Sequence, residues 1–482
     1  MSILVIDVGT SGLRSAIVNA DAKVGHIEYR PFAPNSPAPG LVEFDAVAMG
    51  QAVLEVTRAT LAGTTDHIDA LGISTQRAST VVWDRATGEP IGPSLGWQDL
   101  RTVFDCIMAK ASHGLALAPN QSATKVAWLL NTYDANRSRD LLFGTIDTWI
   151  AWVVSSGALH ITDHTNAAVT GLYDTAARTW STRACAALGV PMRMLPTIVD
   201  SSGELGIATA LPGAPMIGGL AGDQQASLIG QGCVRPGQAK ITFGTGGMLD
   251  LCTGAEPPKN PNRASHGTFP IVAWTREGQA TWGIEAIMLS AGTNVEWLRD
   301  DLGIIDTAAH SHDVAAQCET ADGVVFVPAL LGLGTPHWDY GARGTLLGIT
   351  RGTGRAHIVR AVLEGVAHRG ADLVEAAEAD SGLTIGALRI DGGMSENPTF
   401  TQALANASGR SVEVSPVIEA TTLGASYLAG LAAGTWTHLD EVADSWAPAI
   451  VVEPNATLDR ERWHEAVHRS SRWIPDLSAL DF

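Results

Sequence analysis

Short apolar runs separated by polar turns open the chain. The first three runs are each bounded by turn residues, and they predict a three-stranded meander: Ser2 to Ile6, Arg14 to Val18 and Val24 to Tyr29. Apolar residues then recur at helical spacing between Phe44 and Leu61, and Ile68 to Ile73 again has the pattern of a buried strand. Helices and strands alternate to about Asp223, which predicts an α/β fold.

The second half of the chain repeats the way in which the first half begins. Ile241 to Phe243 is an apolar run that enters the turn Gly244-Thr245-Gly246-Gly247, and Met248 to Cys252 continues as another strand-like run. A Gly-Thr turn also follows the first predicted strand, at Gly9-Thr10. This short internal repeat fits two similar domains that face each other.

The last part of the chain carries two further patterns. Ala387 to Ile390 is strand-like and is followed by Asp391-Gly392-Gly393 and a helix that begins near Asn397, while Glu419 to Leu431 is predicted to be a helix of small residues suited to close packing. The tail after about residue 435 is predicted to pack on the body of the protein, because it contains Trp436, Trp446, Trp463 and Trp473.

Candidate catalytic and phosphate-binding residues lie where apolar runs end. Asp223 ends one such run just before a helix-like segment, and the glycine turn at 244–247 ends the next. A carboxylate can take a proton from a hydroxyl group, and the backbone amides of a glycine turn can hold phosphate oxygens. Together they suggest phosphoryl transfer to an alcohol. Asp223 could equally cap the helix that follows it, and the glycines could form a plain tight turn.

The first turn offers a second candidate site. Asp7, Gly9, Thr10, Ser11 and Arg14 could hold Mg²⁺ and phosphate, with Arg14 as a positive clamp, although a plain hairpin turn has the same composition. The segment Asp391 to Asn397 is either a simple loop-to-helix junction or part of a ligand site at strand ends.

Composition limits the class of protein. A chain of 482 residues is too long for one core and predicts two large domains. The net charge of −19 argues against a nucleic-acid surface. No signal peptide and no membrane-spanning run is found, and the five scattered cysteines are predicted to be reduced thiols, so the protein is expected to be cytoplasmic.

Several common site motifs are absent from the sequence. It has no P-loop and no protein-kinase motifs, and its dispersed histidines indicate no zinc site. The segment Asp163-His164-Thr165-Asn166 is predicted to be a buried hydrogen-bonded loop rather than a set of metal ligands.

Taken together, the motifs resemble those of the FGGY carbohydrate kinases, and within that family most closely those of the glycerol kinases. The matching segments follow one another along nearly the whole chain: 6–14, 75–90, 96–102, 124–130, 144–152, 161–168, 221–231, 243–248, 332–353 and 390–400.

The resemblance implies an actin-like ATPase (ribonuclease H-like) fold with two domains around a catalytic cleft. Residues 1–230 would bind the acceptor and carry the first phosphate loop, and residues 231–482 would bind ATP. By similarity, Asp223 is the general base and Asp7 lies where the family holds Mg²⁺. The implied nucleotide contacts are Thr10, Ser11, Arg14, Thr245, Gly246, Gly292, Glu296, Gly393 and Asn397, and the implied acceptor contacts are Arg77, Ala78, Trp97, Asn120, Asp223, Gln224 and Met248. Family members are often dimers or tetramers, so a homodimer or homotetramer is expected.

The acceptor positions depart from the glycerol kinase pattern. Those enzymes usually carry Glu where this chain has Ala78, Tyr at the position of Asn120 and Phe at the position of Met248. A hydrogen bond to a charged group contributes about 1.5–3 kcal/mol, so losing the Glu predicts a roughly tenfold or larger loss for glycerol. The expected acceptor is therefore a somewhat larger polyol, such as a tetritol or pentitol, or a ketopentose. The Met-His-Gly of xylulose kinases is missing near position 77, which argues against xylulose.

Two alternatives remain open at this stage. One is a ketopentose kinase of the ribulose or xylulose type, which differs from a polyol kinase only in its acceptor. The other is a non-catalytic, actin-like nucleotide sensor, because that fold also serves in filaments and chaperones. Asp223, Arg77 and Trp97 favour an enzyme, since a filament has no need of an acceptor pocket.

Overall fold

The computed structural model describes residues 1–417 and 419–480 of the chain. Its centre is a thirteen-stranded mixed sheet, which consists of two halves. The first half contains, in spatial order, β13 (Ser202–Ile207), β14 (Met216–Gly222), β5 (Ile68–Thr75), β1 (Ser2–Val8), β2 (Gly12–Asn19) and β3 (Val24–Pro31). The predicted meander is confirmed, because β1, β2 and β3 pair antiparallel in chain order.

The second half of the sheet repeats this arrangement. Its strands, in spatial order, are β23 (Ile450–Val452), β22 (Val412–Val414), β21 (Leu388–Asp391), β15 (Ala239–Phe243), β16 (Gly247–Gly254), β18 (Gln279–Met288) and β17 (Phe269–Arg276). In both halves a first strand pairs antiparallel with the strand after its Gly-Thr turn, and parallel with a later strand on its other side. Within the sheet, the halves meet where β13 runs parallel to β17, at the residue pair Ser202 and Arg276.

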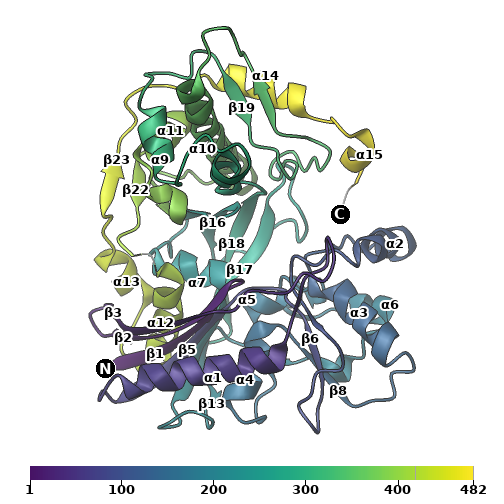
Figure 1. The fold of residues 1–482 in the computed structure, drawn as a ribbon. Helices are drawn as coiled ribbons and strands as arrows, with labels where there is room; N and C mark the ends of the chain where they lie inside the picture. The colour runs from purple at the N-terminus through teal and green to yellow at the C-terminus, as the bar shows by residue number, and fades with distance from the viewer. Residues whose placement is uncertain (418, 481–482) are drawn as a thin grey trace.

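Two helices cross between the halves of the sheet (Figure 1). α7 (Asp223–Gly230) follows a strand of the first half yet contacts β16 and β17 of the second, and α12 (Ala420–Ala433) contacts β1, β5 and β14 of the first. The helices approach so closely that a Cβ atom on Gly424 would collide with the carbonyl oxygen of Ala226. The prediction of a small-residue helix made for close packing is therefore confirmed.

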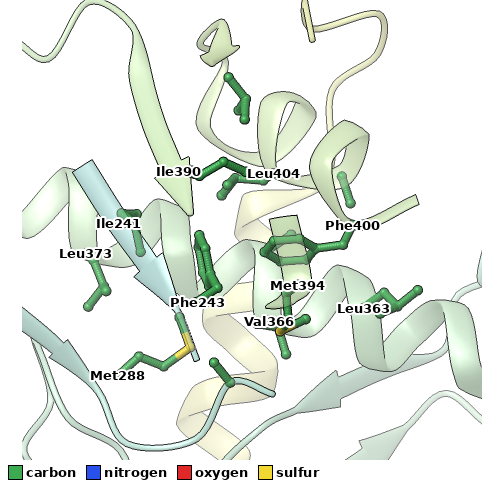
Figure 2. Packing of buried hydrophobic residues seen from close by; sticks show 14 of the residues in the cluster. Ile241, Phe243, Met288, Leu363, Val366, Leu373, Ile390, Met394, Phe400 and Leu404 are labelled. Atoms are coloured by element: carbon green, nitrogen blue, oxygen red, sulfur yellow. The ribbon is translucent and has the colours of Figure 1, made fainter. Parts of the chain in front are cut away.

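Separate cores support the two halves. In the first, α1 (Ala46–Ala62) and α4 (Ile146–Val154) pack on the sheet around the buried Trp83 and Trp149. In the second, α10 (Arg355–Ser381) and α11 (Pro398–Ser408) cover β15 and β21. Figure 2 shows Phe243 directed into this second core, where its ring meets the edge of Phe400 at a centroid distance of 4.8 Å. The end of β15, just before the glycine turn, is thus fixed by packing.

The first half contains one more packed cluster within the described residues. It is formed by β6 (Val81–Asp84), β8 (Leu141–Gly144), α2 (Val103–His113), α3 (Ser122–Tyr133) and α6 (Thr182–Leu188). The remaining elements are β4 (Glu43–Phe44), β7 (Ser94–Leu95), β9 (Ile161–Asp163), α5 (His164–Ala167), β10 (Tyr173–Asp174), β11 (Thr179–Trp180), β12 (Thr197–Val199), α8 (Thr293–Glu296), α9 (His310–Ala315), β19 (Val325–Val327), β20 (Thr345–Leu347), α13 (Leu439–Ser445), α14 (Arg460–Ser470), α15 (Pro475–Ser478), two 3-10 turns at Met192–Met194 and Gly393–Glu396, and a π turn at Trp297–Asp301.

Two sequence predictions need correction. The first helix begins at Ala46 rather than Phe44, because Phe44 pairs with Ser94 in a short sheet and Asp45 caps the helix through the amide of Ala48. The tail packs on the body through the fully buried Trp463, but Trp473 is 73% exposed and does not take part.

Candidate active site

Three of the predicted site residues meet at the carboxyl ends of parallel strands. β1, β5 and β14 run parallel, with β5 in the middle, and their registers place Asp7 opposite Ser74 and Gly222 opposite Thr75. Asp7 is near the end of β1, Arg77 follows β5, and Asp223 follows β14. Since ligands of α/β sheets bind outside the carboxyl ends of strands, this edge is the expected place for a site.

Asp223 does not cap the helix that it begins. It is the first residue of α7, Gly222 is the cap residue, and no side chain caps this helix terminus. Within the described residues, the side chain of Asp223 accepts its one hydrogen bond from the neighbouring amide of Gln224, at 2.8 Å to Oδ1. Burial raises the pKa of Asp223, and the positive charge of Arg77 opposes that rise. The capping interpretation is wrong, and the carboxylate is free to act as a proton acceptor.

Arg77 lies between two carboxylates. Its Nη2 donates to Glu285 Oε2 at 2.5 Å, and its Nε is 3.6 Å from Asp223 Oδ1. Its Nη1 is buried and has no hydrogen-bond partner in the described part of the chain. A Cβ atom on Gly222 would come within 2.7 Å of the Arg77 side chain, so this site requires glycine there. The Nη1 group of Arg77 is therefore available to donate to a ligand oxygen.

Three further predicted acceptor residues are Ala78, Trp97 and Asn120. Ala78 has a φ of 61° within a tight turn that the Ser79 amide closes onto the Arg77 carbonyl at 2.8 Å. Trp97 donates from its ring nitrogen to Thr10 Oγ1 at 3.1 Å, which links the acceptor region to the first phosphate loop. Asn120 is two residues before Ser122, whose hydroxyl donates to the Ala78 carbonyl at 2.9 Å.

The remaining acceptor candidates belong to α7 and β16. Gln224 accepts a hydrogen bond from Lys240 at 2.7 Å, and Met248 is half-buried on β16, where it pairs with Thr242 of β15.

Asp7 and Arg14 form the first candidate phosphate and metal site. The Ser74 hydroxyl donates to Asp7 Oδ1 at 2.6 Å, and Arg14 lies 3.4 Å from the other carboxylate oxygen. Burial raises the pKa of Asp7 to about 6, partly offset by Ser74 and Arg14. Arg14 also forms an ion pair with Glu419 at the start of α12. Ser11 is exposed beside this pair in the turn between β1 and β2.

A second turn cluster lies at the corresponding edge of the other half. β15 and β21 run parallel, so Gly244 and Gly393 follow neighbouring strand ends. The amide of Gly292 donates to the Gly244 carbonyl at 2.9 Å, and the amide of Ala291 donates to Thr245 at the same distance. A Cβ atom on Gly393 would meet nothing within 4 Å, so its backbone borders open space. This arrangement can hold an anionic group through backbone amides.

The other predicted nucleotide residues differ in their surroundings. Gly246 is part of the turn that Ala291 and Gly292 support, and Glu296 is exposed on α8. Asn397 caps α11 by accepting from the Phe400 amide at 3.1 Å, and its Nδ2 donates to Ser311 at 2.8 Å. Asn397 thus has structural partners of its own.

Sequence reasoning missed several residues of the site. Glu285, Lys240 and Asp250 contact the acceptor residues or one another from buried strands, and Glu419 contacts Arg14. The feature of the sequence that could have identified them is a charged residue in the middle of an apolar strand. Burying such a charge costs free energy unless the charge is paired.

Other titratable groups form no second site in the described residues. Asp163 is a buried hydrogen-bond acceptor for Ser201, Thr165 and Asn166, which confirms the predicted buried hydrogen bonding of that segment. The predicted loop is wrong, because Asp163 ends β9 and caps α5. Thr165 in turn accepts from the Gly222 amide at 2.8 Å. The cysteines are free thiols, four of them buried. Among residues 1–417 and 419–480, the one metal-like group is Asp372, Glu375 and His464, where Arg460 already pairs with both carboxylates.

Comparisons with known proteins agree with this architecture. Residues 2–230 match the model of the N-terminal domain of the FGGY family of carbohydrate kinases, and residues 239–433 match the model of its C-terminal domain. The chain is 40% identical to the glycerol kinase of Dechloromonas aromatica over 98% of both chains, and 39% identical to that of Deinococcus radiodurans over 99% of both.

Solved structures show the same fold. The crystal structure of Plasmodium falciparum glycerol kinase with ADP has a TM-score of 0.90 and 29% sequence identity, and the match covers 97% of this chain and 98% of that one. The expected two-domain, actin-like ATPase fold is confirmed. None of the helices within the described ranges combines the length and the apolar character needed to cross a membrane.

Proposed function

The chain belongs to the FGGY family of carbohydrate kinases and is an ATP-dependent kinase of a sugar or polyol, and we propose that its acceptor is a polyol somewhat larger than glycerol. The observation that carries this proposal is the Asp223–Arg77 pair, which lies next to a methyl group at Ala78. We also propose that residues 1–230 and residues 231–482 form its two domains. A cytoplasmic location and a homodimer or homotetramer also stay predictions.

Asp223 acts as the general base in this proposal. Its carboxylate takes the proton of the acceptor hydroxyl as that oxygen attacks the terminal phosphorus of ATP. Arg77 Nη1, which is buried and has no hydrogen-bond partner among the described residues, orients a neighbouring hydroxyl of the acceptor. Trp97 closes the pocket on the side of Thr10. Asn120, Gln224 and Met248 complete the acceptor contacts.

The two turn clusters suit a nucleotide and its metal ion. Asp7 offers a carboxylate oxygen, the ligand type that Mg²⁺ prefers, and the open backbone at Gly393 borders the second cluster. We assign Thr10, Ser11, Arg14, Thr245 and Gly246 to the phosphates, and Gly292, Glu296, Gly393 and Asn397 to the rest of the nucleotide. When bound, Mg²⁺ would neutralise charge that develops on the phosphates.

Ala78 is the reason to expect an acceptor other than glycerol. Its side chain is buried in the turn next to Arg77 and cannot accept a hydrogen bond. A site without that acceptor loses about 1.5–3 kcal/mol for each hydrogen bond to a charged group, which corresponds to roughly tenfold or more for glycerol. A ketopentose is the second candidate, since the same change also makes room for an open sugar.

An acceptor screen tests the proposal. Purified protein with ATP and Mg²⁺ would be assayed for ADP release with glycerol, erythritol, arabitol, ribitol, xylulose and ribulose. We expect the highest kcat/KM with a tetritol or pentitol. A clear preference for glycerol would refute the larger-polyol proposal, and a preference for ribulose would establish the ketopentose alternative.

The base assignment has its own test in Asp223→Asn. Turnover should fall by about 10²–10⁴-fold, because an amide cannot accept the proton, while ATP binding measured by calorimetry persists. Asp21→Asn, at an exposed turn, is the matched control and should keep full activity. Full turnover in Asp223→Asn would show that another group takes the proton.

A further inference from the structure

Three charged side chains form a row across the second half of the sheet. Lys240 of β15 pairs in register with Asp250 of β16, and Asp250 pairs with Glu285 of β18. Lys240 and Asp250 are completely buried, and Glu285 is 6% exposed. Lys240 Nζ lies 2.8 Å from Asp250 Oδ2. Burying a charged side chain costs free energy unless the charge is paired, so each of these three side chains needs a partner.

The row contacts two acceptor residues of the first half. Glu285 binds Arg77 at 2.5 Å, and Lys240 donates to Gln224 at 2.7 Å. Both contacts join parts of the chain that belong to different halves of the sheet. The acceptor site is therefore held partly by β15 and β18, which contribute none of the predicted acceptor contacts themselves.

Arg77 is committed to Glu285 rather than to Asp223. A charge-assisted hydrogen bond between nitrogen and oxygen is about 2.7–2.9 Å long, and a separation of 3.6 Å is beyond hydrogen-bond range. The Arg77–Glu285 contact, at 2.5 Å, is short enough for such a hydrogen bond, whereas the 3.6 Å between Arg77 and Asp223 allows an ion pair without one. An aspartate in a direct arginine pair would be a weaker base, because the cation stabilises its charged form.

We propose that Glu285 is a positioning residue for phosphoryl transfer, which holds the Arg77 guanidinium away from Asp223 and so keeps that carboxylate available to the acceptor hydroxyl. This inference rests on the proposed role of Asp223 as the base. It assigns a function to a glutamate that is separated from Arg77 by more than 200 residues in sequence.

The charges around Asp223 set the direction of the expected effect. Asp223 is faced by Arg77 after β5, by Lys240 and Asp250 from the sheet of the second half, and by Asp7 from β1, while Glu285 faces Arg77. Without the charge of Glu285, Arg77 has Asp223 as its nearest free anion. The guanidinium then moves toward Asp223, and the pKa of that carboxyl falls.

The test is the pH profile of Glu285→Gln. With the best acceptor of the screen, the acid limb of kcat/KM should move to lower pH by about one unit, since a nearby opposite charge lowers a carboxyl pKa by about 1–3 units. At pH 8, kcat should fall about tenfold, because a weaker base accepts a proton less readily. Glu285→Asp keeps the charge and should restore much of the wild-type profile.

A matched variant separates positioning from stability. Asp372→Asn removes the charge of another buried pair, Arg369 with Asp372, which is remote from Asp223 in the second half. It should lower the melting temperature and leave the acid limb where it is in the wild type. An unmoved acid limb in Glu285→Gln would overturn the proposal.

A second readout needs no turnover. The unfolding free energy is measured against pH for the wild type and for Asp223→Asn, and the same two measurements are made with Glu285→Gln present in both proteins. In each background, the difference in unfolding free energy between the proteins with and without Asp223→Asn reports the ionisation of Asp223. We expect its midpoint to lie at lower pH in the Glu285→Gln background, and an identical midpoint would refute the inference. If no acceptor in the screen is phosphorylated, the proposed function fails while this measurement still decides the role of Glu285.

Discussion

At the scale of single residues, Ala78 is the most informative position for the acceptor. The variant Ala78→Glu places a carboxylate next to Arg77, where a small polyol such as glycerol would offer its hydroxyl groups. We expect kcat/KM for glycerol to rise by about tenfold or more, in line with about 1.5–3 kcal/mol for a hydrogen bond to a charged group. Coupled ADP detection with glycerol and with the best larger polyol measures this change.

Ala78→Gln serves as the control for this substitution, because it adds nearly the same volume without the charge. It should reduce activity with the larger polyol and gain much less with glycerol. Equal gains in both variants would mean that shape rather than hydrogen bonding determines the acceptor.

Asp7 leads to a prediction about pH. Its pKa is raised from 3.8 to about 6 in the folded protein, so its contribution to stability is complete below pH 3.8 and is lost as the pH rises through about 6. The ionised side chain costs about 3 kcal/mol above that range. In Asp7→Asn the melting temperature relative to the wild type should therefore rise between pH 4 and pH 7, while activity is largely lost.

Differential scanning calorimetry at several pH values measures this relative shift. Ser74 can still donate to the amide oxygen of the variant, so the substitution changes mainly the charge. A constant difference in melting temperature across this pH range would show that Asp7 titrates normally in the folded protein.

The sequence predicted the residues at or just after strand ends better than those in the middle of strands. Asp7, Arg77 and Asp223 stand next to apolar runs, and the parallel strands bring them together. Glu285 and Lys240 lie inside strands, where the pattern of one strand does not reveal its partner across the cleft. Whether Asp223 capped its helix also depended on the backbone at Gly222, which the sequence left open.

At the scale of elements, the crossing of α7 and α12 determines where Asp223 lies. In Gly424→Ala the added methyl group would collide with the Ala226 carbonyl, and the helices must separate. We expect a loss of up to about 3 kcal/mol in unfolding free energy, as for other overpacked sites. Because α7 begins at Asp223, kcat should fall as well. Urea unfolding and the ADP assay measure the two effects.

Gly386→Ala is the matched control, since a Cβ atom there would meet nothing within 4 Å and its φ is not in the left-handed region. Its stability should stay within about 0.5 kcal/mol of the wild type. If Gly424→Ala were equally neutral, the close approach of the two helices would have no energetic importance.

The prediction for a helix succeeded where its amino-acid composition alone determines how closely it can pack. The small residues of Glu419 to Leu431 indicated close packing, but which helix they meet depends on strands far away in sequence. The start of the first helix was misplaced because Phe44 is apolar and in phase with it, although the residue pairs in a strand.

At the scale of the whole molecule, the repeated strand order explains why one short Gly-Thr repeat was informative. Each half places a turn after its first strand, and each turn lies beside the end of a parallel neighbour. The repeat predicted two facing halves. It could not predict contacts between them, such as Arg14 with Glu419 or Arg77 with Glu285, because these depend on how the halves are joined.

The Arg14–Glu419 ion pair joins the two halves at the proposed phosphate site. Arg14 belongs to β2, and Glu419 stands at the start of α12, with both side chains partly exposed. Phosphate oxygens that bind Arg14 must compete with this carboxylate. In Glu419→Gln the competition is weaker, so we expect the Kd for ATP to fall about threefold to fivefold, which corresponds to the upper range for a partly exposed ion pair.

Calorimetric titration with a non-hydrolysable ATP analogue measures this affinity, and Arg14→Gln provides the opposite control, in which the Kd should rise. The difference in Kd between Glu419→Gln and the wild type should become smaller at high salt, because salt already screens the ion pair that the substitution removes. A Kd that rises in both variants would mean that Glu419 orients Arg14 for the nucleotide instead of competing with it. The ion pair would then be part of the nucleotide site before ATP arrives, and both halves would contribute to the first phosphate contact.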